Sequence, residues 1–144
     1  EDLFSGKQLY AVKKDGSGQY LLTEGIMYPT VEGDNLWFSG KKGEVTKLSL
    51  ETGEEKKWNG TYALRIIPYK DAVYYHNSGS LHVIKDEEKG PEEIYPNDSE
   101  GKHIIDLFWV AADKLFFCDY LKEGDKNLTF QYLDLENGEL GIVP

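Results

Sequence analysis

The chain has 144 residues, of which 40% are hydrophobic and 13% aromatic, and its formal net charge is −10. This length suits one ordinary domain with a continuous core, and the hydrophobic content excludes a disordered chain. The excess of acidic residues, with no basic stripe, argues against nucleic acid as a partner, and no apolar run reaches the roughly 18 residues of a membrane-spanning segment.

One short phrase occurs three times along the chain: an Asp, one variable residue, an aliphatic residue and two aromatic residues. The copies are Asp34-Asn35-Leu36-Trp37-Phe38, Asp71-Ala72-Val73-Tyr74-Tyr75 and Asp113-Lys114-Leu115-Phe116-Phe117. A β-rich run precedes each copy, at Met27 to Val31, Tyr62 to Pro68 and Ile104 to Val110. This arrangement predicts a β-hairpin with the Asp in its turn.

Each phrase is followed by a third strand with alternating apolar residues, then by a Gly-containing turn and a short fourth strand. We expect these turns at Glu51-Thr52-Gly53, Glu88-Lys89-Gly90 and Glu136-Asn137-Gly138. Four antiparallel strands joined by tight turns are typical of a propeller blade. No long segment keeps the spacing of an amphipathic helix, so we expect almost no helix.

The sequence therefore predicts an all-β fold, an antiparallel β-propeller segment of about three and a half four-stranded blades. We expect one repeat domain, 1–144, with blades at approximately 1–24, 26–59, 62–97 and 103–143. Leu3-Phe4-Ser5-Gly6 is similar to Trp37-Phe38-Ser39-Gly40, which places the first residues inside the second strand of an incomplete blade. The chain begins with neither an initiator Met nor a signal-peptide pattern, so we expect that its natural start is missing.

The incomplete first blade leaves two hypotheses open. Either the remaining blades of a longer polypeptide complete the ring, or a homodimer forms through this blade. We favour the longer polypeptide, because a bare blade face exposes an apolar patch that soluble monomers avoid. The chain by itself is then expected to form dimers or aggregates.

The aromatic residues of the phrases form two columns. Trp37, Tyr74 and Phe116 occupy one equivalent position and Phe38, Tyr75 and Phe117 the next, so the columns lie on opposite faces of their sheets. We expect both columns to fill the spaces between blades. Three other tyrosines, interpreted as loop residues, are the candidates for facing a ligand: Tyr69, Tyr95 and Tyr120.

No catalytic or metal constellation is expected, and no cofactor. His76 and His82 flank an Asn-Ser-Gly-Ser turn and, if they face each other, supply two nitrogens, which is too few for a metal unless His103 or Asp106 joins them. A cross-strand surface contact is the preferred interpretation of this pair. Cys118 has no partner for a disulfide and is interpreted as a buried small residue.

Leu36-Trp37-Phe38-Ser39-Gly40 and Leu115-Phe116-Phe117-Cys118-Asp119 resemble the YWTD repeat of the low-density-lipoprotein-receptor propellers, and the segment from Leu9 to Gly18 is similar to the stretch that follows it there. The chain resembles more closely a family of bacterial propeller-repeat proteins of unknown function, often secreted or lipid-anchored and often from Firmicutes. The resemblance implies a six-bladed ring that binds a protein or a glycan. It also implies an extracellular or cell-envelope location, and leaves the cytoplasm as an alternative.

We therefore expect a noncatalytic binding or scaffold module for a protein or glycan partner at the surface of a Gram-positive cell. The alternative is a propeller enzyme, of the sugar-processing or lactone-hydrolase type, with a metal in its central channel. Such an enzyme needs Asp, Glu or Asn at the same point of successive inner strands. The expected inner strands are nearly free of carboxylates, Asp106 excepted, which favours binding.

Overall fold

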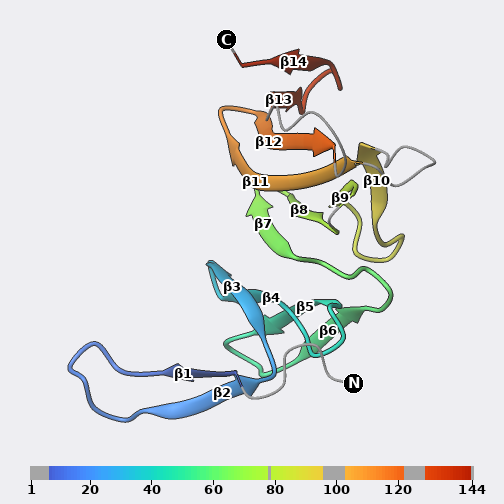
Figure 1. Cartoon of the computed structure of the whole chain (residues 1–144). Coiled ribbons are helices and arrows are strands. Elements are labelled where there is room, and N and C mark those ends of the chain that lie inside the picture. The colour runs from blue at the N-terminus through green and yellow to red at the C-terminus, as the bar shows by residue number, and fades with distance from the viewer. Residues whose placement is uncertain (1–6, 78, 96–102, 122–128, 144) are drawn as a thin grey trace. The chain divides into compact units, whose positions relative to one another are not determined.

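The computed structural model describes residues 7–77, 79–95, 103–121 and 129–143, which Figure 1 shows in colour. Within these ranges the chain forms fourteen strands in four antiparallel sheets and no helix, which confirms the all-β prediction. The predicted strand at Leu3-Phe4-Ser5-Gly6 lies outside the described residues. The chain divides into two compact units, Glu1–Ile66 and Ile67–Pro144, and each is described by itself.

The first unit contains a two-stranded and a four-stranded sheet. The two-stranded sheet consists of β1 (Gln8–Ala11) and β2 (Tyr20–Glu24). The four-stranded sheet follows the chain order, with β3 (Met27–Glu32), β4 (Asn35–Ser39), β5 (Val45–Ser49) and β6 (Glu55–Trp58). Leu9 of β1 packs against a buried cluster formed by Ile26, Leu36, Phe38 and Leu48. The two sheets of this unit therefore share one hydrophobic core.

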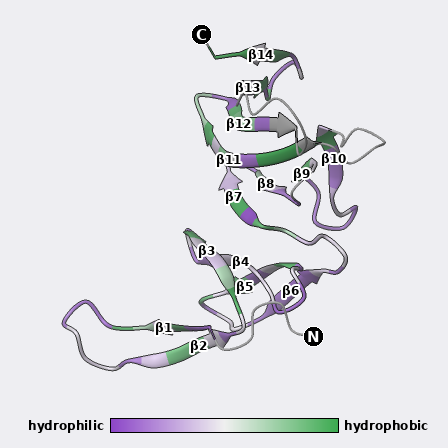
Figure 2. Cartoon of the chain, viewed as in Figure 1, coloured by the Kyte–Doolittle hydropathy of each residue, from purple (hydrophilic) through white to green (hydrophobic). Residues whose placement is uncertain are grey.

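The second unit, with β7 starting just before it, contains two four-stranded sheets that repeat the same order. One consists of β7 (Arg65–Tyr69), β8 (Ala72–His76), β9 (Leu81–Ile84) and β10 (Glu92–Tyr95). The other consists of β11 (His103–Ala111), β12 (Lys114–Leu121), β13 (Thr129–Asp134) and β14 (Leu140–Ile142). Figure 2 shows that β11 is largely hydrophobic while β6 is hydrophilic, although each is an edge strand of its sheet.

The repeated phrase forms the predicted hairpin. The turns between the first two strands hold Gly33 and Asp34, Lys70 and Asp71, and Ala112 and Asp113. In two copies the carbonyl oxygen of the Asp also accepts a hydrogen bond from the residue after the third strand: Leu50 donates to Asp34 at 2.8 Å and Leu135 donates to Asp113 at 2.9 Å. The phrase thus connects the first hairpin to the end of the third strand.

The turn before each fourth strand is also repeated. The N–H of Gly53 donates to the carbonyl of Ser49 at 2.9 Å, that of Gly90 to Asp86 at 3.0 Å, and that of Gly138 to Asp134 at 2.9 Å. All three glycines have positive φ, between +75° and +82°. This conformation is costly for residues with a Cβ, which explains why each copy places Gly at this point.

The two aromatic columns lie on opposite sheet faces, which we name here. The front face of a four-stranded sheet carries Trp37, Tyr74 or Phe116, and the back face carries Phe38, Tyr75 or Phe117. In the second unit, front-face Tyr74 and back-face Phe117 belong to the same buried cluster, together with Leu81, Val83, Ile105, Phe108, Leu115 and Leu133. The prediction that rings fill the space between successive sheets is therefore confirmed for Tyr74 and Phe117, where the packing is front to back, whereas Phe116 is only half-buried and does not belong to this cluster.

Candidate functional site

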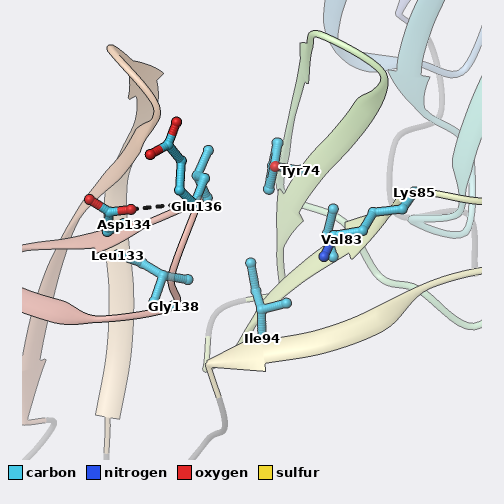
Figure 3. Close-up of a pocket in the computed structure, with 9 residues that line it drawn as sticks. Tyr74, Val83, Lys85, Ile94, Leu133, Asp134, Glu136 and Gly138 are labelled. Atoms are coloured by element: carbon cyan, nitrogen blue, oxygen red, sulfur yellow. Dashed lines mark hydrogen bonds between the residues drawn. The ribbon is translucent and has the colours of Figure 1, made fainter.

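A groove lies between the two sheets of the second unit, and Figure 3 shows part of it. It consists of two adjoining cavities, of about 270 Å³ and about 370 Å³, that share Tyr74, Lys85, Leu135 and Glu136. One wall of the groove is formed by β7, β8, β9 and β10, together with the turn after β9. The other wall is formed by β13 and by the turns at Asp113 and Glu136. We call this feature the inter-sheet groove. Each cavity is near the lower limit of a small-ligand pocket, about 300 Å³.

The floor of the inter-sheet groove is apolar. Figure 3 shows Tyr74, Val83 and Ile94 on one side and Leu133 on the other. Tyr74 and Val83 are opposite each other in the register of β8 and β9, so both point toward the next sheet. The same alternation that builds the core therefore supplies the floor of the groove.

The rim at the β7–β8 turn is charged and held by hydrogen bonds. The ammonium group of Lys70 donates to Oδ1 of Asp113, and the Tyr69 hydroxyl lies 3.3 Å from the same oxygen. The N–H of Asp113 also donates to the Tyr69 hydroxyl at 3.2 Å. The hydrogen bond with Lys70 lowers the pKa of Asp113 and raises that of Lys70. This rim therefore presents a fixed ion pair near neutral pH.

The opposite rim is the turn after β13. Lys114 Nζ lies 2.7 Å from Oδ2 of Asp134, and Oδ1 of Asp134 accepts hydrogen bonds from the N–H of Glu136 at 3.0 Å and of Asn137 at 3.4 Å. The hydrogen bond from Lys114 is the largest cause of a lowered pKa of Asp134, and the two bonds from the turn N–H groups lower it further. The turn is thereby fixed with the exposed side chain of Glu136 at the groove, as Figure 3 shows.

Charged side chains line the groove beside a buried tyrosine. The carboxylates of Asp113 and Asp134 are held ionised by lysines, and burial raises the pKa of Tyr74, with Asp113 contributing. Among the described residues that line the groove there is no histidine, cysteine, serine or threonine.

The three tyrosines proposed from the sequence are in strands, so their assignment to loops is wrong. Tyr69 ends β7, Tyr95 ends β10 and Tyr120 lies within β12. Tyr69 lines the groove through a half-buried ring, whereas the Tyr95 hydroxyl donates to Asp119 at 2.8 Å and its ring packs on Phe117. The side chain of Tyr120 lies outside the described residues. The misplacement of Tyr69 and Tyr95 has a simple reason: each ends a strand and is followed at once by turn-forming residues, as a tyrosine in a loop is. That these tyrosines meet a ligand stays a prediction.

The two histidines of β8 and β9 do not face each other, which corrects the cross-strand interpretation. The register pairs His82 with Tyr75 and His76 with Leu81, so the imidazoles lie on opposite faces of the sheet. His82 stacks on Tyr75 with ring centroids 4.8 Å apart, and burial lowers its pKa, while His76 packs against Phe108. In the described ranges no group of three or more His, Cys, Asp or Glu residues has a geometry that can hold a metal ion.

Sequence reasoning missed Lys85 and Glu136 as groove residues. The sequence places Glu136 in a turn, and Lys85 follows β9. Nothing in the local sequence pattern shows that these two residues, 51 positions apart in the chain, line the same groove. The available signal was the repeat itself, since Lys85 and Glu136 both follow the third strand of their sheets, and equivalent strands of successive sheets of one construction end at the same side.

Comparison with known proteins gives a likeness of fold. No family model matches this chain, and no curated protein matches it. Among solved structures, one chain from a complex of Saccharomyces cerevisiae Dbp5 bound to Nup159, Gle1, IP6 and ADP is similar, with a TM-score of 0.66 over 96% of this chain and 9% sequence identity. This chain spans 45% of the length of that chain. In the described residues no helix is long and apolar enough to cross a membrane.

Proposed function

We propose that the chain is part of a β-propeller and serves as a noncatalytic binding module for a protein partner, outside the bacterial cytoplasm. The propeller is supported by three four-stranded antiparallel sheets of the same strand order and turn chemistry, and by front-to-back packing of sheets. The location follows from the resemblance of the repeated phrases to envelope and secreted propeller proteins.

The inter-sheet groove is the observation that carries the binding function. An apolar floor beside charged groups of both signs fits an apolar side chain of a peptide, with its charged neighbours at Lys85 and Glu136. A protein segment suits this surface better than a glycan, because sugars stack on open aromatic faces. Tyr74 in the floor is only 7% exposed, and the Tyr69 hydroxyl already bonds Asp113.

The test is selection of linear peptides displayed on phage against the purified chain, with a glycan array in parallel. Selected peptides are then measured by calorimetry against Leu135→Ala and Glu136→Lys, which alter the floor and rim of the groove. We expect each variant to weaken peptide binding by about tenfold or more, as loss of one anchoring contact does.

The repeat offers matched controls. Leu50 and Glu51 follow β5 as Leu135 and Glu136 follow β13, with the same backbone hydrogen bonds, but they lie in the first unit and line neither cavity. Leu50→Ala and Glu51→Lys should leave peptide binding unchanged. Equal losses in the control and groove variants, binding of glycans alone, or no selected peptide would each contradict the proposal.

A further inference from the structure

Two Asn-Gly pairs lie in turns of the chain, Asn59-Gly60 after β6 and Asn137-Gly138 before β14. In such a pair the backbone nitrogen of the glycine can attack the side-chain carbonyl carbon of the asparagine, because glycine has no side chain to hinder the approach. A five-membered succinimide forms, and the amide nitrogen leaves as ammonia with the proton of the backbone N–H. Water then opens the ring to aspartate or isoaspartate. Each pair is therefore a candidate site of deamidation.

The two pairs have the same exposure and nearly the same backbone conformation. Asn59 and Asn137 are both exposed, and the glycines that follow them have φ values of +79° and +77°. A Cβ placed at either glycine would meet no described atom within 4 Å, so a neighbouring side chain screens neither nitrogen. Sequence and steric access thus do not distinguish the two pairs. Their hydrogen bonds do.

The turn at Asn137 holds both reacting groups. The N–H of Gly138 donates to the carbonyl of Asp134 at 2.9 Å, and Oδ1 of Asn137 accepts a hydrogen bond from the N–H of Glu139 at 2.8 Å. The N–H of Asn137 also donates to Oδ1 of Asp134, at 3.4 Å. Ring closure requires the glycine nitrogen to lose its proton and to turn toward the carboxamide. These hydrogen bonds therefore have to open before the reaction can occur.

The turn at Asn59 holds neither reacting group. In the described part of the chain no hydrogen bond is made by the N–H of Gly60 or by the carboxamide of Asn59. The turn is fixed at its ends instead, where the Thr61 hydroxyl donates to the carbonyl of Trp58 at 2.8 Å and accepts from the N–H of Val45 at 2.8 Å. Asn59 and Gly60 thus connect two anchored residues, while their own reacting atoms are left to rotate.

We propose that Asn59 deamidates in the folded chain, and that the hydrogen bonds of its turn protect Asn137. The protected pair lies at the inter-sheet groove, which Gly138 lines, whereas the susceptible pair lines neither cavity. Deamidation then adds a negative charge to the turn after β6, and in the isoaspartate product an extra backbone carbon, while the rim of the groove is unaltered. This inference rests on the contacts of the two turns and does not depend on what the groove binds.

The test compares the two sites within one molecule. The purified chain is incubated in mildly alkaline buffer, and peptide mapping by mass spectrometry follows aspartate and isoaspartate at each site. A parallel sample in urea gives the rates of the unfolded chain, which we expect to be similar at the two sites. In the folded chain Asn59 should react at close to its urea rate and give both products. Asn137 should react more slowly by about tenfold or more, because two hydrogen bonds must open first.

Two further measurements assign the cause. Asn59→Gln should abolish the product at this site, because glutamine closes a larger ring far more slowly. Amide hydrogen exchange should be fast at Gly60 and slow at Gly138, since only the second N–H is held. Equal deamidation rates at the two sites of the folded chain, a faster rate at Asn137, or aspartate without isoaspartate at Asn59 would overturn the proposal.

Discussion

The hydroxyl of Tyr95 donates a hydrogen bond to Oδ2 of Asp119 at 2.8 Å and joins the two sheets of the second unit through a largely buried carboxylate. Tyr95 ends the outermost strand of one sheet, and Asp119 lies in the second strand of the other. The ring of Tyr95 packs on Phe117, and the two ring centroids are 4.9 Å apart. One residue therefore contributes a polar and an apolar contact to the same junction.

Removal of the Tyr95 hydroxyl should destabilise the chain. Tyr95→Phe keeps the ring against Phe117 but deprives Asp119 of a donor, and a hydrogen bond to a charged group is worth about 1.5–3 kcal/mol. Urea unfolding followed by tryptophan fluorescence measures the loss. Tyr62→Phe, at a 62% exposed side chain, is the control and should change nothing. A Tyr95→Phe variant as stable as the unaltered chain would contradict the role of this bond.

Alkaline pH should unfold the chain through its buried tyrosines. Burial raises the pKa of Tyr75 to about 12, and burial followed by the hydrogen bond with Asp119 raises that of Tyr95 to about 12. An unfolded tyrosine titrates near pH 10, so the stability from these neutral rings is complete below about pH 10 and is lost as the pH rises toward 12. Tyrosinate absorbance and circular dichroism should change together in that range. Full titration near pH 10 with an intact sheet signal would refute this.

Acid should weaken the rims of the inter-sheet groove. Lys70 lowers the pKa of Asp113, and Lys114 with two turn N–H groups lowers that of Asp134. Because an unfolded Asp titrates near pH 3.9, the stability from these carboxylates is present above about pH 4 and is lost as the pH falls through their lower folded pKa values. Asp134→Asn should therefore be less stable than the unaltered chain at pH 7, and the difference should shrink in urea titrations below pH 4.

The two adjacent aromatics of the last phrase should differ in their contribution to stability. Phe117 is fully buried between the sheets, and Phe117→Ala should cost about 3–5 kcal/mol. Phe116 is half-buried on the front face of its sheet, and Phe116→Ala should cost about 1–2 kcal/mol. Chemical unfolding of both variants makes the comparison. Equal losses would show that both faces of this sheet are equally buried in solution.

The turn glycines should resist substitution for a backbone reason. Gly53 has a φ of +75°, and a Cβ at this position meets nothing within 4 Å. Gly53→Ala should therefore cost about 1–2 kcal/mol through conformation alone, and Gly53→Asn should cost less because Asn tolerates a positive φ. Thermal unfolding of the pair separates backbone strain from crowding. A loss as large for Asn as for Ala would contradict this explanation.

The sequence by itself was sufficient for the succession of strands, the hairpin with Asp34 in its turn and the glycine turn at Gly53, but not for the strand ends at Tyr69 and Tyr95. These features depend on neighbours along the chain, because side-chain alternation and turn conformation are set within a few residues. The division of the aromatics into two faces follows from the same local rule, and it held for Tyr74 and Phe117.

Only the tertiary structure decided which face meets which, and where the groove lies. Tyr95 looked free to bind a ligand because its partner Asp119 is in another sheet, and His82 looked like a partner of His76 until the register paired it with Tyr75. The groove residues Lys85 and Glu136 converge because the front face of one sheet packs against the back face of the next. Such contacts are made between residues far apart in the chain, where local pattern carries no information about proximity, so their physical cause appears only once the sheets are packed.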